Sequence, residues 1–171
     1  MLKTGGEIIV IELSPALEAL TENKVDFIIV GGVAITAYGS AYITKALDFC
    51  YLRTAENLKR IVHALAQFNP RLRDFPKELP FVWDERTLQN GTNFTLETEI
   101  GDIDLLGEVA GVGDYKAVES ESVEMELCDV FVKVISLNDL INAKRAAGRT
   151  KDLLVLPELE AIREALSDEE E

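Results

Sequence analysis

Hydrophobic positions divide the first half of the chain into alternating strands and helices. Apolar residues are nearly continuous over 25–30 and predict a buried strand, which a pair of glycines ends before a short helix over 33–38. A second strand is expected over 46–52. Apolar residues at helical spacing then predict a helix that begins after Thr54, a residue type suited to capping its first turn.

The second half of the chain predicts a hairpin followed by two further strands. Polar and apolar residues alternate over 92–98, a glycine-containing turn follows, and 102–106 runs back. Apolar residues over 122–127 and 130–135 predict two more strands.

Two C-terminal helices are expected over about 136–166, with Ser136 as the first cap and Pro157 interrupting or restarting the second helix. An acidic tail over 167–171 is expected to be frayed. This order of elements predicts an α/β (α+β) fold, a mixed β-sheet flanked by helices, in a single domain over 1–171.

Composition narrows the classes of partner. The chain has 171 residues and a net charge of −14, which argues against a broad basic surface for nucleic acid. Apolar runs stay below the ~18 residues of a membrane span, and the first residues lack a signal-peptide pattern, so a cytoplasmic protein without membrane contact is expected. The sequence offers two candidate local basic patches, first Lys144, Arg145, Arg149 and Lys151, and secondly Arg71 with Arg73.

Acidic residues recur on the strands near the glycine pair. The glycine pair is Gly31-Gly32, and the acidic residues lie in Thr44-Lys45-Ala46-Leu47-Asp48 and Gly101-Asp102-Ile103-Asp104. Residues two apart on a strand face the same side, and carboxylate oxygens are the ligands that hard cations take. Glycines between a strand and a helix can bring backbone amides close to a phosphate.

This combination resembles the active site of the nucleotidyltransferase superfamily, with its polymerase beta-like fold. That superfamily has a Gly-Gly turn, a D-x-D pair on the next strand and a third acid on a later strand. The resemblance implies that Asp48 and Asp104 are catalytic ligands of Mg²⁺, with Asp104 preferred to Asp102 because two aliphatic residues follow it. It further implies that Gly31, Gly32, Thr44 and Lys45 bind the nucleoside triphosphate substrate.

Residues 136–152 resemble the Lys…Arg-x-x-Asp region of AbiEii-like and related toxin–antitoxin nucleotidyltransferases. The resemblance implies that Lys144 contacts the triphosphate, that Arg149 and Lys151 flank it, and that Asp152 orients a basic group. The alternative reading of the same residues is a solvated basic helix end.

Ala46 departs from the family pattern, because it stands where the first acid of D-x-D belongs. Either an alanine was introduced to abolish activity, or the site has decayed naturally. The first explanation is favoured because Asp48, Asp104 and Lys144 remain.

The resulting hypothesis is transfer of a nucleoside monophosphate to a hydroxyl acceptor, an RNA 3′ end or a protein, by a toxin–antitoxin-related enzyme impaired at Ala46. A cognate toxin or antitoxin is a candidate partner. The alternative is a non-catalytic module, either a nucleotide-binding pseudoenzyme or a partner-binding antitoxin.

Overall fold

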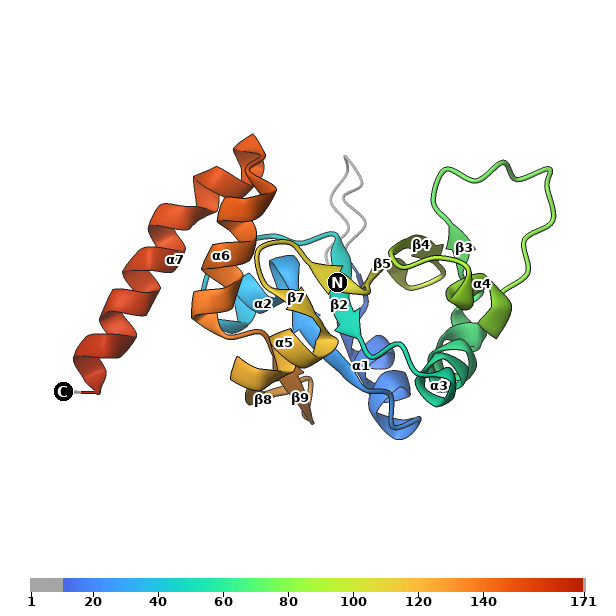
Figure 1. Cartoon of the computed structure of the whole chain (residues 1–171), viewed down its shortest axis with the longest axis horizontal. Helices are drawn as coiled ribbons and strands as arrows, with labels where there is room; N and C mark the ends of the chain where they lie inside the picture. Colours follow the sequence, from blue (N-terminus) through green and yellow to red (C-terminus); the bar gives the residue numbers. More distant parts are fainter. Residues whose placement is uncertain (1–10, 171) are drawn as a thin grey trace.

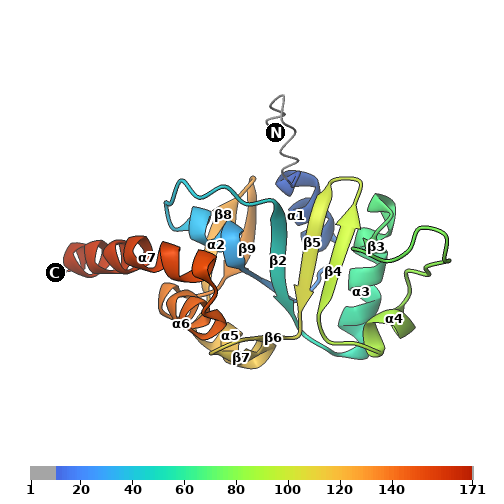
Figure 2. The ribbon, with the colours of Figure 1, turned by 90° about the horizontal axis from the view of Figure 1, so that it is seen from above.

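The computed structural model describes residues 11–170, which are arranged around a seven-stranded mixed sheet (Figures 1 and 2). Two neighbouring pairs, β1 with β9 and β2 with β5, are parallel, and the others are antiparallel. Across the sheet the strands are β3 (Arg71–Leu72), β4 (Phe94–Thr98), β5 (Gly101–Leu106), β2 (Ala46–Tyr51), β1 (Phe27–Val30), β9 (Val130–Val134) and β8 (Val123–Leu127). A small second sheet pairs β6 (Glu108–Val109) with β7 (Gly113–Asp114).

Helices cover both faces of the sheet. On one face lie α1 (Leu13–Glu22) and α3 (Ala55–Leu65), which contact each other. On the other lie α5 (Tyr115–Glu121) and α6 (Leu137–Ala147), while α2 (Gly31–Ala37) directly follows β1. The remaining helical elements are η1 (Ala66–Phe68), α4 (Glu85–Gln89) and α7 (Thr150–Glu169). The predicted α/β class, a mixed sheet flanked by helices, is therefore confirmed.

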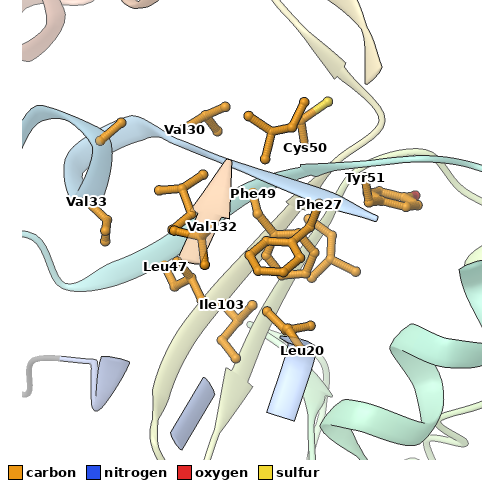
Figure 3. Close-up of a cluster of buried hydrophobic side chains, with 14 of the residues drawn as sticks. Leu20, Phe27, Val30, Val33, Leu47, Phe49, Cys50, Tyr51, Ile103 and Val132 are labelled. Carbon is orange, nitrogen blue, oxygen red and sulfur yellow. The ribbon is translucent and has the colours of Figure 1, made fainter. Parts of the chain in front are cut away.

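The two faces of β2 differ in chemistry, and this difference positions the site. Leu47 and Phe49 are fully buried toward α1, where Phe49 packs edge-to-face on Phe27 with ring centroids 5.6 Å apart (Figure 3). Burying one such side chain is worth about 1.5–3 kcal/mol. Because side chains alternate along a strand, Ala46 and Asp48 lie on the opposite face. The apolar face anchors the strand that presents Asp48.

The C-terminal helices largely follow the sequence pattern. Ser136 caps α6 by accepting a hydrogen bond from the Asp139 N–H (3.0 Å), and Gly148 ends it at φ +64°. Two expectations were wrong. Helix α7 continues through Pro157 without interruption and extends to Glu169, into the expected tail. Pro157 is exposed, so water can bind the carbonyl that its missing N–H leaves free.

Figure 1 shows α7 extending away from the sheet, with α6 as its main neighbour. Between residues 11 and 170, no helix is both long enough and apolar enough to cross a membrane.

Candidate active site

The turn after β1 lies directly against the acid of β2. Val30 is paired with Asp48 in the β1–β2 register, and Gly31 follows with φ +66°. A Cβ atom at Gly31 would lie 2.2 Å from Oδ2 of Asp48, so only glycine leaves room for the carboxylate. Gly32 makes the same kind of close approach elsewhere, because its Cβ would lie 2.6 Å from Oγ1 of Thr44.

The acids lie opposite each other on adjacent parallel strands. In the β2–β5 register, Asp48 faces Asp104 and Ala46 faces Asp102, so all four share one face of the sheet. Oδ1 of Asp48 is buried without a hydrogen-bond partner among the described residues. Burial and then the negative charge of Asp104 raise the pKa of Asp48 to about 7. Such a carboxylate is suited to binding a cation or a proton.

Arg73 is a member of this group that the sequence pattern did not indicate as a site residue. Its Nη2 donates to Oδ1 of Asp104 at 2.7 Å, and its Nε lies 3.4 Å from Oδ2 of Asp102. Arg73 was expected only as part of a secondary basic patch, yet its charge is matched by two carboxylates. Local sequence carries no signal of this contact, because it depends on how β3 pairs with β4.

Three charged residues of the C-terminal helices form a compact network opposite Asp48. Asp152 is 1% exposed and accepts hydrogen bonds from Arg149 Nε (2.6 Å) and Lys144 Nζ (3.3 Å). Burial alone would raise the pKa of Asp152, but the hydrogen bonds from Arg149 and Lys144 lower it below its usual range. Lys144 is itself only 16% exposed, which contradicts the alternative of a solvated helix end at this residue.

A cavity of about 250 Å³ lies between the glycine turn and α6. Asp48, Lys144, Arg149 and Asp152 line its charged part together with Gly31. Its apolar lining consists of Val30, Leu106, Val109, Ala110, Ile135, Leu140, Ala143 and Ala147. Asn93 and Glu108 complete the wall. The cavity can therefore contact charged groups as well as a flat apolar group.

The other expected site residues do not line this cavity. Thr44 donates from Oγ1 to the Ala46 carbonyl (2.8 Å) and packs on Gly32, so it fixes the loop before β2. Lys45 is exposed. Lys151 is exposed in the first turn of α7, but its positive charge acts to lower the pKa of Asp48. Asp104 stands beside the cavity, next to Asp48.

The acidic side chains here suit one divalent cation whose other ligands come from substrate and water. They do not suit a cation held by protein side chains alone. In residues 11–170, no three acidic, histidine or cysteine side chains are grouped closely enough to hold a metal. Asp48 offers an unpartnered oxygen, and Asp104 has one oxygen engaged by Arg73. Mg²⁺ is commonly bound by one or two carboxylates that are completed by substrate phosphates and water. Asp48 and Asp104 fit that mode.

Comparison with known proteins bears on the fold. The chain matches no family model. It also matches no curated protein sequence.

Several solved structures are similar, including the following three. The lincosamide antibiotic adenylyltransferase LnuA, solved with lincomycin, has a TM-score of 0.59 and 14% identity over 91% of this chain and 99% of its own. The antibiotic-resistance factor ANT(2'')-Ia has a TM-score of 0.54 and 15% identity, over 92% and 90% of the two chains. A Thermotoga maritima protein described as a candidate nucleotidyltransferase has a TM-score of 0.51 and 14% identity, over 91% of each chain. This chain has the nucleotidyltransferase fold.

Proposed function

We propose that this protein transfers a nucleoside monophosphate from a nucleoside triphosphate to a hydroxyl acceptor, with Mg²⁺ held by Asp48 and Asp104. The observation that carries the proposal is the meeting of three features at one cavity of a nucleotidyltransferase fold. These are the Gly31 turn, the half-buried Asp48 with Asp104 beside it, and the cations organised by Asp152.

The cavity suggests how the nucleotide lies. The apolar lining from β5, α6 and Ile135, which directly follows β9, suits a nucleobase, and Lys144 with Arg149 suits the triphosphate. Asp152 holds both cations in place, because each donates to its buried carboxylate. The proposal also assigns Gly32, Thr44, Lys45 and Lys151 to binding of the phosphates.

The reaction follows from these positions. The acceptor oxygen bonds to the α-phosphorus, the bond from that phosphorus to the pyrophosphate oxygen breaks, and the hydroxyl proton passes to a carboxylate or to water. Mg²⁺ neutralises charge that develops on the phosphate oxygens when it is bound. Lys144 and Arg149 offset the charge of the leaving pyrophosphate from the opposite wall. Asp48 and Asp104 are the residues that would hold the cation, through the unpartnered oxygen of Asp48 and the carboxylate of Asp104.

Ala46 weakens this site. Its place on β2, two residues before Asp48 and opposite Asp102, is where a further carboxylate would face the same cation. We propose that the chain as it stands binds Mg²⁺–NTP weakly and transfers slowly. Whether the alanine was introduced or arose naturally is decided by sequencing the native gene.

The acceptor is proposed by class. The similar enzyme LnuA is a lincosamide antibiotic adenylyltransferase. We therefore propose three candidate classes of acceptor: a small hydroxyl-bearing molecule, a protein hydroxyl and an RNA 3′ end. The net charge of −14 favours a small molecule or a protein over long nucleic acid. We retain an AbiEii-like, toxin–antitoxin-related role in the cytoplasm, with a cognate partner, as part of this proposal.

Nucleotide binding is the direct test. We expect Mg²⁺ with a non-hydrolysable NTP to bind the unaltered chain measurably by calorimetry. Binding should weaken at least about tenfold in Lys144→Ala, the scale for losing one charged contact. No heat of binding for any of the four common NTPs would refute the proposal.

The second candidate, a non-catalytic binding module, is favoured by one observation, the missing acid at Ala46. Transfer of label from radiolabelled NTP, measured for the unaltered chain and for Ala46→Asp, distinguishes the two functions. Label transfer by Ala46→Asp supports the enzyme, whereas a stable protein complex that needs no nucleotide supports the binding module.

A further inference from the structure

Arg73 reaches the acids of β5 from the edge of the sheet. It directly follows β3, and its backbone N–H donates to the Thr95 carbonyl at 2.8 Å. Its Nη2 donates to the Leu96 carbonyl at 3.1 Å as well as to Asp104. The side chain therefore extends across β4 to lie on the row of acids, where it is 29% exposed.

The strand register shows why a cation is needed at this place. Asp102 and Asp104 project from one face of β5, and Asp48 projects beside them from β2. When all three carboxylates are ionised, they repel one another unless a cation lies among them. Arg73 supplies a guanidinium that keeps its charge at every physiological pH, in contact with two of the three.

Within residues 11–170, the contacts of Arg73 leave part of the acid row without a partner. Nε of Arg73 is buried and has no hydrogen-bond partner among the described residues, although it lies 3.4 Å from a carboxylate oxygen of Asp102. Asp104 has one oxygen bound by Nη2 of Arg73, whereas the guanidinium makes no ion pair with Asp48. A cation that binds Asp48 must therefore share Asp104 with Arg73.

We propose that Arg73 is a resident counter-cation of the acid row and takes the place of one of the two metal ions that a nucleotidyl-transfer site can hold. It positions Asp104, and it limits the site to a single divalent cation between Asp48 and Asp104. The catalytic role of that cation rests on the proposed function, but the number of cations that the acid row binds does not. Arg73 is a positioning residue, because it acts through Asp104.

Mn²⁺ alone, added without nucleotide, is the probe. Its affinity and stoichiometry are measured by electron paramagnetic resonance on the full chain and on Arg73→Gln. We expect one weak Mn²⁺ site in the unaltered chain. Removing the competing positive charge should tighten Mn²⁺ binding roughly tenfold or admit a second ion.

Arg71→Gln is the matched control. Arg71 lies two residues earlier, and its guanidinium contacts the carbonyls of Pro76 and Leu79 instead of the acids. Its loss should leave Mn²⁺ affinity unchanged, which separates a local effect at Asp104 from a general loss of positive charge. An equal rise in both variants would overturn the inference.

Two further comparisons complete the test. If Arg73→Gln does not fold, Arg73→Lys replaces it, because lysine keeps the charge but lacks the fork of the guanidinium. Mn²⁺ affinity should then rise by less than about tenfold. Unchanged affinity in the folded Arg73 variant overturns the inference. NTP binding is measured separately, so a chain that binds no nucleotide refutes the proposed function while the Mn²⁺ result still decides the role of Arg73.

Discussion

Gly31 and Asp48 approach so closely that a Cβ atom on the glycine would lie 2.2 Å from Oδ2 of the acid. The glycine also has φ +66°, a conformation that other residues adopt only with strain. Val30 is paired with Asp48 across β1 and β2, so the turn begins at the level of the acid. The glycine therefore brings main chain against the carboxylate that we propose as a metal ligand.

Gly31→Ala should destabilise the protein by about 2–4 kcal/mol, because backbone strain and a clash act together. Gly148→Ala is the control, since Gly148 has φ +64° and its nearest prospective contact is 3.6 Å away. That variant should lose only about 1 kcal/mol. Urea unfolding measures both, and equal losses would show that the contact with Asp48 is unimportant.

Ala46→Asp should strengthen Mg²⁺ binding and raise the rate of transfer by at least roughly tenfold, because it adds a carboxylate on the face of Asp48. Ala46→Asn is the matched control, with the same size and no charge. Calorimetry and a label-transfer assay give the two readouts. If the aspartate and asparagine variants have the same Mg²⁺ affinity, position 46 is not a ligand.

Asp48 should make the stability of the metal-free protein depend on pH. Its pKa is about 7 in the folded state, above its ordinary value, so the folded state holds a proton that the unfolded state has released. Stability from this group is therefore full below about pH 4 and is lost as the pH rises toward 7. Asp48→Asn should remove this loss and be more stable at pH 8 by about 1–2 kcal/mol. Thermal unfolding at pH 5 and pH 8 measures it; a less stable asparagine variant at pH 8 would contradict the assignment.

Lys144→Ala, made in the Ala46→Asp background, should lower transfer by roughly tenfold to a thousandfold, the range for one preorganised charge contact. Its cost in stability should be about 1 kcal/mol, since buried Asp152 keeps Arg149 as a partner. Arg145→Ala is the control, because Arg145 is paired with Glu160 away from the cavity. Transfer that is equally fast in both variants would remove Lys144 from the site.

The sequence predicted the features that depend on local patterns. Alternation along β2 and β5 placed Ala46, Asp48, Asp102 and Asp104 on strand faces, and the glycine pair indicated the turn beside them. The toxin–antitoxin relation and the inactivation at Ala46 stay predictions.

Contacts between distant segments were beyond the reach of these patterns. The Arg73–Asp104 pair requires β3, β4 and β5 to be aligned, and the burial of Asp152 requires α6 and α7 to pack together. The expected interruption at Pro157 is wrong because the cost of proline in a helix depends on whether water reaches the neighbouring carbonyl.

The parallel pairing of β1 with β9 affects how the chain is made. Residues 27–30 emerge from the ribosome about a hundred residues before the strand over 130–134 that covers one of their edges. Until then, the apolar sequence Phe-Ile-Ile-Val has an open hydrogen-bonding edge, which invites pairing with other chains. Nascent chains that stall before residue 130 should therefore depend on chaperones, and fragments cut there should aggregate.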